Sequence, residues 1–371
     1  MQMVFVLISG HMLASTPLIK RVLNLLISKV RSESQGLIVV SIFSVIACWI
    51  NWGFGLIVSG ILAVEMARKL SRVNFGLFLA TAYAGFLVWH GGLSGSIPLK
   101  IAEGDEILKT VYPGLSIPLH ETILSNWNLL IVFILLLGLP LLALWMRTDE
   151  KDEVVVDHRE LKAEVVAVHN LRDKFENFSG FNILFFILIL FGIFNKDSAF
   201  DINKVNAIFL ALALLLHKTP RLFLKALQDS IGYASGIVIQ FPFYAGIMGL
   251  MQHSGLADQL SGVFVNISTS NTLPLWAFLS GGIVNFFVPS GGGQWVVQGP
   301  IMLKAARDLA ADPAKVSMAL AWGDAWTNMI QPFWALPLLG LAKLKLKDIM
   351  GYCLIYLFFS GVVISAVLIL S

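Results

Sequence analysis

Asp324 has the most unusual setting in this sequence, because it is the only charged residue in the apolar stretch MALAWGDAWTNMIQPFW, residues 318–334. A carboxylate inside a membrane is costly, so such a residue is by default a candidate for a functional site. A bound cation would neutralise its charge. We therefore predict that Asp324, together with Asn328, binds a coupling ion, either H⁺ or Na⁺. The alternative is a structural carboxylate that accepts hydrogen bonds from the backbone of a broken helix.

Glycines and neutral polar residues interrupt a second apolar stretch, NFFVPSGGGQWVVQGP, residues 285–300. A helix that restarts after such a break presents free N–H groups and the positive end of its dipole, which suits an anion. Similar polar residues surround a break at Asn51 and occur in WHGGLSGSIPL, residues 89–99. We predict that the substrate-binding residues are Asn51, His90, Ser94, Ser290, Gly291, Gly292, Gly293, Gln294, Thr327 and Asn328.

The chemistry of these residues limits what they could bind or catalyse. We find no lysine or arginine deep in any apolar stretch, and a dicarboxylate would usually pair with a buried guanidinium. The sequence therefore favours a small, singly charged anion with an apolar tail. His90 could carry a proton, and a structural hydrogen bond explains it equally well. His90 and Ser94 would suit a hydrolase, but Ser94 lacks the setting of a nucleophile elbow, so we expect no enzyme and no metal or other cofactor.

The composition indicates a membrane protein. Of the 371 residues, 57% are hydrophobic and only 13% are charged, and the mean hydropathy is +0.79, whereas soluble domains carry about 25% charged residues. The net charge of +3 is better explained by basic loops than by nucleic-acid binding, so we expect no nucleic-acid partner. Cys48 and Cys353 both lie in apolar stretches, which excludes a disulfide framework. We expect an all-α protein that crosses the lipid bilayer several times.

Two apolar stretches, 36–65 and 273–303, are too long for simple membrane spans. As one straight helix each would measure about 45 Å, against a hydrocarbon core of about 30 Å. Both break near the middle, at Asn51–Gly55 and at Pro289–Gly293. We therefore predict two re-entrant helical hairpins, each followed by a broken transmembrane helix. The predicted spans are 1–19, 75–99, 127–146, 178–194, 204–217, 230–251, 316–342 and 349–370, of which 75–99 and 316–342 are the broken ones.

The basic residues predict the orientation of the hairpins. Residues such as Arg31 and Arg68 flank 36–65 on both sides, so the positive-inside rule places both ends of this hairpin in the cytoplasm. The acidic loop 100–126 then lies outside, and the second hairpin opens outward. Arg307, at the outer end of the second hairpin, departs from the rule.

The two hairpins align without a gap at an offset of 239 residues, with 10 identities in the 47 positions from 53 to 99. Arg307 aligns with Arg68, which explains why it lies outside. Since the hairpins open to opposite sides, the repeats are inverted, which is typical of secondary transporters with a site near the membrane midplane. We predict a first inverted repeat over residues 1–146, a cytoplasmic linker over 147–177 and a second inverted repeat over 178–371.

The segments VPSGGGQWVVQGP, AWGDAWTNMIQPFW and WHGGLSGSIPL resemble the short-chain fatty acid transporter family of bacteria, within the wider ion-transporter superfamily. The resemblance covers essentially the whole chain, although family members are longer at the N-terminus. It implies a multi-pass inner-membrane carrier that takes up small monocarboxylates such as butyrate or acetoacetate. It also implies homodimers, elevator-type alternating access and symport with Na⁺ or H⁺. The resemblance carries the ligand positions over to Asn51, Ser290, Gly291, Gly292, Gly293, Asp324, Thr327 and Asn328.

Other functions remain open at this stage. A carrier for dicarboxylates or another small organic anion is the main alternative, since the superfamily contains such proteins. An intramembrane hydrolase and a channel fit less well. A channel would not need two re-entrant tips, an inverted repeat and a single titratable acid.

Overall fold

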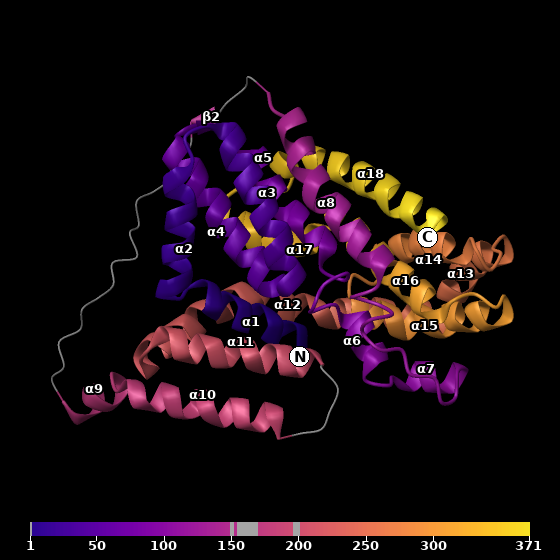
Figure 1. Cartoon of the computed structure of the whole chain (residues 1–371), viewed down its shortest axis with the longest axis horizontal. Coiled ribbons are helices and arrows are strands. Elements are labelled where there is room, and N and C mark those ends of the chain that lie inside the picture. Colours follow the sequence, from indigo (N-terminus) through magenta and orange to yellow (C-terminus); the bar gives the residue numbers. More distant parts are fainter. Residues whose placement is uncertain (1, 149–151, 154–169, 196–200) are drawn as a thin grey trace.

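The computed structural model describes residues 2–148, 152–153, 170–195 and 201–371. Within these residues the fold is helical apart from one two-residue strand pair, as predicted for an all-α protein (Figure 1). The α-helices are α1 (Gln2–Ala14), α2 (Pro17–Lys29), α3 (Glu33–Ile50), α4 (Trp52–Leu70), α5 (Phe75–Ala84), α6 (Ser96–Ala102), α7 (Glu106–Val111), α8 (Asn126–Trp145), α9 (Leu171–Glu176), α10 (Ser179–Phe194), α11 (Ile202–His217), α12 (Pro220–His253), α13 (Leu256–Asn266), α14 (Leu273–Asn285), α15 (Gly291–Asp308), α16 (Pro313–Thr327), α17 (Pro332–Ala342) and α18 (Lys347–Leu370). The 3₁₀ helices are η1 (Gly85–Val88) and η2 (Asn328–Ile330), and strand β1 (Arg72–Val73) pairs with β2 (Asp152–Glu153).

Both long apolar stretches are interrupted at the predicted places. Asn51 separates α3 from α4, and residues 286–290 separate α14 from α15. The arms of the first hairpin, α3 and α4, have 18 and 19 residues, so the observed hairpin extends beyond the predicted range 36–65 at both ends. Each would reach about 27–29 Å, close to the thickness of the hydrocarbon core, so the tilt of the arms sets the depth of the tip.

The helices that follow the hairpins are also broken where expected. α5 tightens into η1, the chain leaves the helix over residues 89–95, and α6 begins at Ser96. In the second half α16 tightens into η2, and α17 begins at Pro332. Proline suits the first turn of a helix because no intrahelical partner is available for an N–H there.

The boundaries of these segments correspond at the offset of 239 residues. The N-cap Asn51 of α4 aligns with the N-cap Ser290 of α15. Ser71, the C-cap of α4, aligns with Ala310, which follows two residues after the end of α15, and both have positive φ angles, 58° and 53°. Gly104 and Lys343 follow the broken helices at aligned positions and have φ angles of 83° and 55°. L-residues rarely adopt such angles, so the shared turns are a specific likeness of the two halves.

The open ends of the hairpins contact different loops. At the first hairpin, the Glu33 side chain of α3 accepts a hydrogen bond from the backbone N–H of Asn74 at 2.9 Å. The same carboxylate lies 3.6 Å from the side chain of Arg147, just after α8. At the second, Arg307 of α15 donates to the Val111 carbonyl at 3.3 Å, in the segment before α8. The two open ends therefore contact segments on either side of α8 in the chain.

Several predicted spans differ from the observed helices. The first predicted span, 1–19, ends early because Thr16 caps a new helix that starts at Pro17. α12 has 34 residues, more than the predicted 230–251, and α13 was not predicted. Of the described helices, α3, α8 and α18 are long and apolar enough to cross a bilayer. Most of the predicted linker, 147–177, lies outside the described residues, apart from β2 and the short α9.

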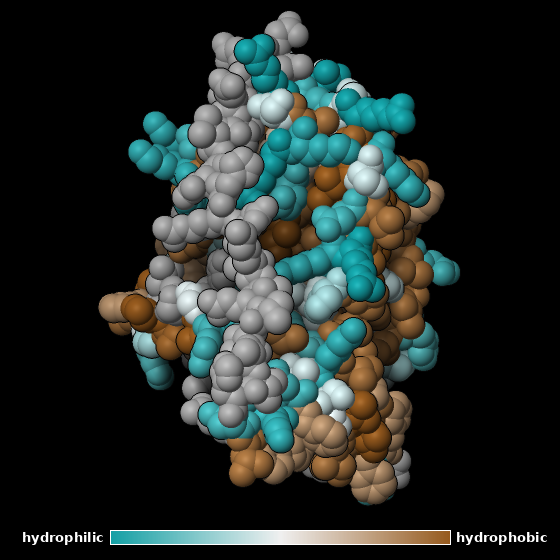
Figure 2. All heavy atoms as spheres, turned by 90° about the vertical axis from the view of Figure 1, so that its left-hand side faces the viewer, coloured by the Kyte–Doolittle hydropathy of each residue, from teal (hydrophilic) through white to brown (hydrophobic). Residues whose placement is uncertain are grey.

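Apolar side chains cover much of the surface. On α8, α10 and α18 they include Trp145, Phe191 and Val362, which are 74%, 66% and 71% exposed. Figure 2 shows the side of the molecule on which α2 and α9 lie. Hydrophilic side chains cover the middle and top of this view, and hydrophobic side chains cover its right-hand side. Such extensive exposed apolar surface is suited to lipid.

Candidate functional site

The tip of the first hairpin is fixed against the break in the next helix. The Asn51 side chain caps α4 by accepting a hydrogen bond from the Phe54 N–H at 2.9 Å. The Trp52 N–H donates to Ser94 Oγ at 2.9 Å, and the Leu93 N–H donates to the Trp49 carbonyl at 2.7 Å. Ser94, a predicted substrate ligand, thus uses its hydroxyl to hold the tip.

The tip of the second hairpin reaches the same broken segment. Ser290 caps α15 by accepting from the Gly293 N–H at 3.4 Å. A Cβ atom built on Gly291 would overlap the imidazole of His90 and would lie 2.7 Å from Ser96 Oγ. Only glycine allows this approach, so the main chain at the start of α15 is in direct contact with residues 90–96.

The central contact of the site joins His90 and Asp324. His90 Nε2 lies 3.1 Å from Asp324 Oδ2, and the two side chains are 0% and 1% exposed. His90 comes from the break after η1, whereas Asp324 comes from α16, so this contact joins the two broken helices. Buried charges are tolerated when they are paired or protonated. The contact therefore gives the buried Asp324 carboxylate a polar partner.

Asn285 organises the backbone around Asp324, and the sequence analysis missed it. Its Nδ2 lies 3.0 Å from the Asp324 carbonyl, 3.0 Å from Thr327 Oγ1 and 2.9 Å from Asn328 Oδ1. Thr327 in turn donates to the Gly282 carbonyl at 2.9 Å. Thr327 and Asn328, both predicted ligands, therefore connect α16 to the first arm of the second hairpin. The available signal was an isolated amide at the end of an apolar run, directly before the break.

The remaining predicted residues face different neighbours. Gln294 donates to the Gly281 carbonyl at 2.7 Å and to Gln298 at 2.8 Å, so it packs α15 against α14. A Cβ on Gly293 would lie 3.2 Å from Met248 Sδ, on α12. A Cβ on Gly292 would lie 3.4 Å from Lys100 Nζ. The sequence analysis missed Lys100, which lies one residue beyond the predicted span 75–99 and which the folded chain brings to the tip on α6.

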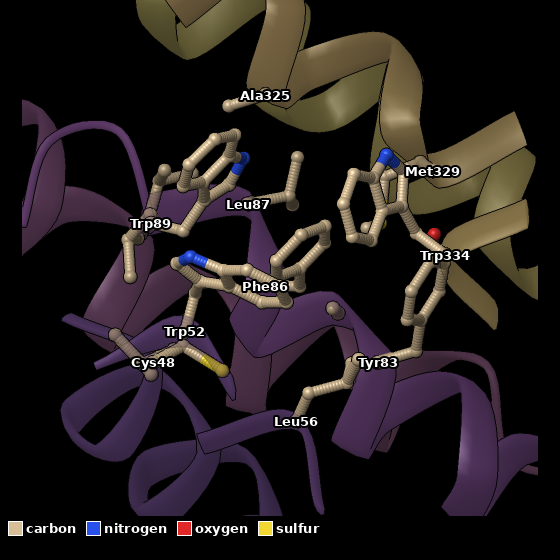
Figure 3. Packing of buried hydrophobic residues seen from close by; sticks show 14 of the residues in the cluster. Cys48, Trp52, Leu56, Tyr83, Phe86, Leu87, Trp89, Ala325, Met329 and Trp334 are labelled. Atoms are coloured by element: carbon tan, nitrogen blue, oxygen red, sulfur yellow. The ribbon is translucent and has the colours of Figure 1, made fainter. Parts of the chain in front are cut away.

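Tryptophans fill the space beside the first tip. Trp52 packs edge-on against Trp89 and Trp334, with ring centroids 6.0 Å and 5.2 Å apart, and Phe86 stacks on Trp89 at 5.6 Å (Figure 3). These rings come from α4, from η1 and the break after it, and from α17, so one aromatic cluster joins the first hairpin to both broken helices (Figure 3). Phe286 and Phe287, next to the second tip, are instead 49% and 44% exposed.

Several buried polar atoms here have no hydrogen-bond partner within the described part of the chain. They include Asn51 Nδ2, Trp89 Nε1, His90 Nδ1 and Ser96 Oγ. Leaving such groups unpaired is costly, so a polar ligand or water would stabilise them. The described residues contain no group of three His, Cys, Asp or Glu side chains suited to a metal ion. The arrangement fits a small polar ligand and a proton.

Comparison with known families matches residues 1–371 to the family described as "Short chain fatty acid transporter". An Escherichia coli (strain K12) protein, provisionally named a short-chain fatty acid transporter, is 40% identical over 373 residues, which cover 98% of this chain and 84% of the relative. A protein of Haemophilus influenzae with the same provisional name is 36% identical over 376 residues, covering 97% of this chain and 84% of the relative. The resemblance found in the sequence is thereby confirmed.

Two solved transporters share the fold. The Alcanivorax borkumensis YdaH transporter, described as having an unusual topology, matches with a TM-score of 0.54 and 14% identity over 98% of this chain and 84% of that one. Neisseria gonorrhoeae MtrF, assigned to a class of antimetabolite efflux pumps, matches with a TM-score of 0.52 and 17% identity over 100% of this chain and 80% of that one. At these identities the likeness concerns the fold alone.

Proposed function

Because the chain belongs to the short-chain fatty acid transporter family, we propose that it takes up small monocarboxylates such as butyrate or acetoacetate by proton-coupled symport. The protein would be a multi-pass carrier of the bacterial inner membrane. The family and both relatives are transporters, so the chemistry of the site serves binding and coupling.

The observation that carries this proposal is the buried His90–Asp324 pair beside the start of α15. Its partners lie 3.1 Å apart and are almost fully shielded from solvent. The first-turn amides of α15 offer a carboxylate hydrogen bonds and a favourable dipole. A proton on the pair would offset the negative charge that the substrate brings. Substrate and proton would then bind together and move as a neutral unit.

The coupling ion follows from the same pair. A Na⁺ ion would need several oxygen ligands, whereas an imidazole in contact with a carboxylate is suited to gain and lose a proton. This favours H⁺ over Na⁺ at Asp324, with Asn328 interacting with the same carboxylate. Na⁺ coupling is the competing outcome of the experiment below.

Alternating access would use the two halves of the chain as inverted repeats. The aligned caps Asn51 and Ser290 and the aligned turns at Ser71 and Ala310 support a duplicated unit. The contacts of the two open ends with segments before and after α8 support opposite orientations. In this proposal both hairpins re-enter the membrane, and their tips move with the substrate relative to a scaffold that also forms a homodimer.

Uptake of labelled butyrate into proteoliposomes tests the proposed function. We expect accumulation when a pH gradient, acidic outside, is imposed without Na⁺, and no accumulation when only a Na⁺ gradient is imposed. Unlabelled acetoacetate should compete, and succinate should not. Accumulation driven by a Na⁺ gradient alone would show that Na⁺, and not H⁺, is the coupling ion. Stronger competition by succinate than by acetoacetate would favour the dicarboxylate alternative. Absence of any butyrate movement, including exchange, would overturn the proposal.

A further inference from the structure

Helix α6 directs two side chains at the second tip. Ser96 and Lys100 are four residues apart and therefore lie on one face of the helix. Ser96 Oγ would be 2.7 Å from a Cβ on Gly291, and Lys100 Nζ would be 3.4 Å from a Cβ on Gly292. The two groups thus follow the first turn of α15 in order, a hydroxyl beside Gly291 and an ammonium beside Gly292.

These groups have no partner that would explain their placement. Ser96 is 3% exposed, and its hydroxyl forms no hydrogen bond with the described residues. Within the same residues Lys100 forms no ion pair or hydrogen bond, and it interacts with Glu103 only at longer range. Burial and the nearby Asp201 raise the pKa of Glu103, which weakens it as a competitor for the ammonium. A buried hydroxyl without a partner and a cation without a counter-ion both indicate a missing polar ligand.

The start of α15 completes the set. This helix has 18 residues, and its cap Ser290 accepts a hydrogen bond from Gly293. The N–H groups of Gly291 and Gly292 have no intrahelical partner, because they belong to the first turn. Amide donors, a hydroxyl and an ammonium on facing helices form a set that recognises a carboxylate.

We infer that Lys100, assisted by Ser96, binds the carboxylate of the substrate at the start of α15 and so determines that the protein selects anions over neutral analogues. This inference rests on the proposed function and adds the residue that reads the substrate charge. A single ammonium matches a single carboxylate, which agrees with a preference for monocarboxylates. His90, next to Gly291, and its partner Asp324 would then take up and release the proton while Lys100 binds the anion.

Kinetics of a Lys100→Gln variant test the inference. A hydrogen bond to a charged group contributes enough that its loss should raise the KM for butyrate about 10- to 100-fold. Lys100→Arg should keep most of the affinity. Lys109→Gln is the matched control, because Lys109 is 54% exposed and pairs with Glu106 at 3.0 Å. It should transport like the wild type.

Selectivity provides the second readout. In the wild type, unlabelled butyrate should inhibit uptake far better than the neutral isostere butyramide, and in Lys100→Gln this ratio should fall at least tenfold. If the wild type transports butyrate and Lys100→Gln has the same KM and the same inhibition ratio, the inference about Lys100 is overturned and the proposed function is not. A wild type that neither transports butyrate nor exchanges it would overturn the proposed function. If Lys100→Gln does not fold, Ser96→Ala is tested in its place. We expect a smaller increase in the KM for butyrate than for Lys100→Gln. An unchanged KM in Ser96→Ala would then overturn the inference.

Discussion

The contact between His90 and Asp324 is the centre of the proposed coupling mechanism. Neither side chain is exposed, and they belong to segments that only the folded chain brings together. In the proposed symport mechanism, their contact would stabilise a buried carboxylate and provide a place for a proton.

Replacement of Asp324 by asparagine should separate coupling from binding. The amide keeps the size and the contact with His90 but cannot take up a proton, so butyrate accumulation driven by a pH gradient should fall to the equilibrium level. Exchange of butyrate across the membrane should continue. Asp308→Asn, at a side chain that is 55% exposed, is the control and should accumulate normally. Full accumulation by Asp324→Asn would remove this carboxylate from the coupling mechanism.

Gly291 should be sensitive to the smallest substitution. The methyl group of Gly291→Ala would overlap the His90 ring and press on Ser96, so the second tip must retreat from the pair. We expect butyrate uptake to fall at least tenfold. Gly340→Ala in α17 is the comparison, because a Cβ there would meet no atom within 4 Å. Equal uptake by the two variants would show that the close contact of the tip with His90 has no role.

The hairpins depend on helix ends and on close packing between their arms. Asn51 and Ser290 end one helix and start the next by capping it with their own side chains. The arms of the first hairpin meet at Gly55, where a Cβ would lie among the backbone atoms of Ala47 and Cys48. Backbone cannot give way as a flexible side chain can, so this glycine sets the distance between the arms.

Gly55→Ala should therefore destabilise the protein. Overpacking of this kind costs about 1–3 kcal/mol, and we expect a clear fall in the melting temperature of the detergent-purified protein. Gly351→Ala, in α18 with open space around it, should be neutral or slightly stabilising because alanine favours helix. A Gly55→Ala protein that melts with the wild type would show that the arms are not closely packed.

At the scale of the whole molecule, we predict that the two hairpins open to opposite sides of the membrane, and labelling can test this in cells. Cys48 and Cys353 are buried, so an impermeant thiol reagent should report only introduced cysteines. Ser32 and Ser71 are exposed at the open end of the first hairpin, and Ser270 and Asp308 are exposed at that of the second.

Cysteines at 270 and 308 should react in intact cells, whereas cysteines at 32 and 71 should react only after the inner membrane is opened. The reason is that both ends of each re-entrant hairpin share one side of the membrane. Reaction of positions 32 and 71 from opposite sides would mean that one arm of this hairpin crosses the bilayer and the other does not, and α3, with 18 residues, is long and apolar enough to cross. A cytoplasmic protein with an exposed cysteine, in the same cells, serves as the control: it should react only after the inner membrane is opened.

Local chemistry alone determined where the helices of this protein break. Polar or glycine-rich segments within apolar stretches cannot continue a helix without cost. The helix breaks at Asn51, at residues 286–290 and after Val88 could therefore be predicted from the sequence. The predicted repeat rests on sequence identities at an offset of 239 residues, and the aligned segments share helix caps and turns in the structure. The start of α2 and the length of α12 were misjudged because hydropathy alone does not locate caps such as Thr16 and Thr219, and the polar first turns of α12 lay outside the predicted span 230–251.

Only the tertiary structure decided which polar residues meet. His90 contacts Asp324, Ser94 holds the first tip, Asn285 joins the second hairpin to α16, and Lys100 reaches the second tip. Each of these contacts joins segments far apart in the chain, and their geometry depends on how whole helices pack. Sequence spacing fixes which residues share a face of one helix, but the partner of that face is chosen by packing between helices. The sequence therefore determined the breaks, and the folded chain determined the site.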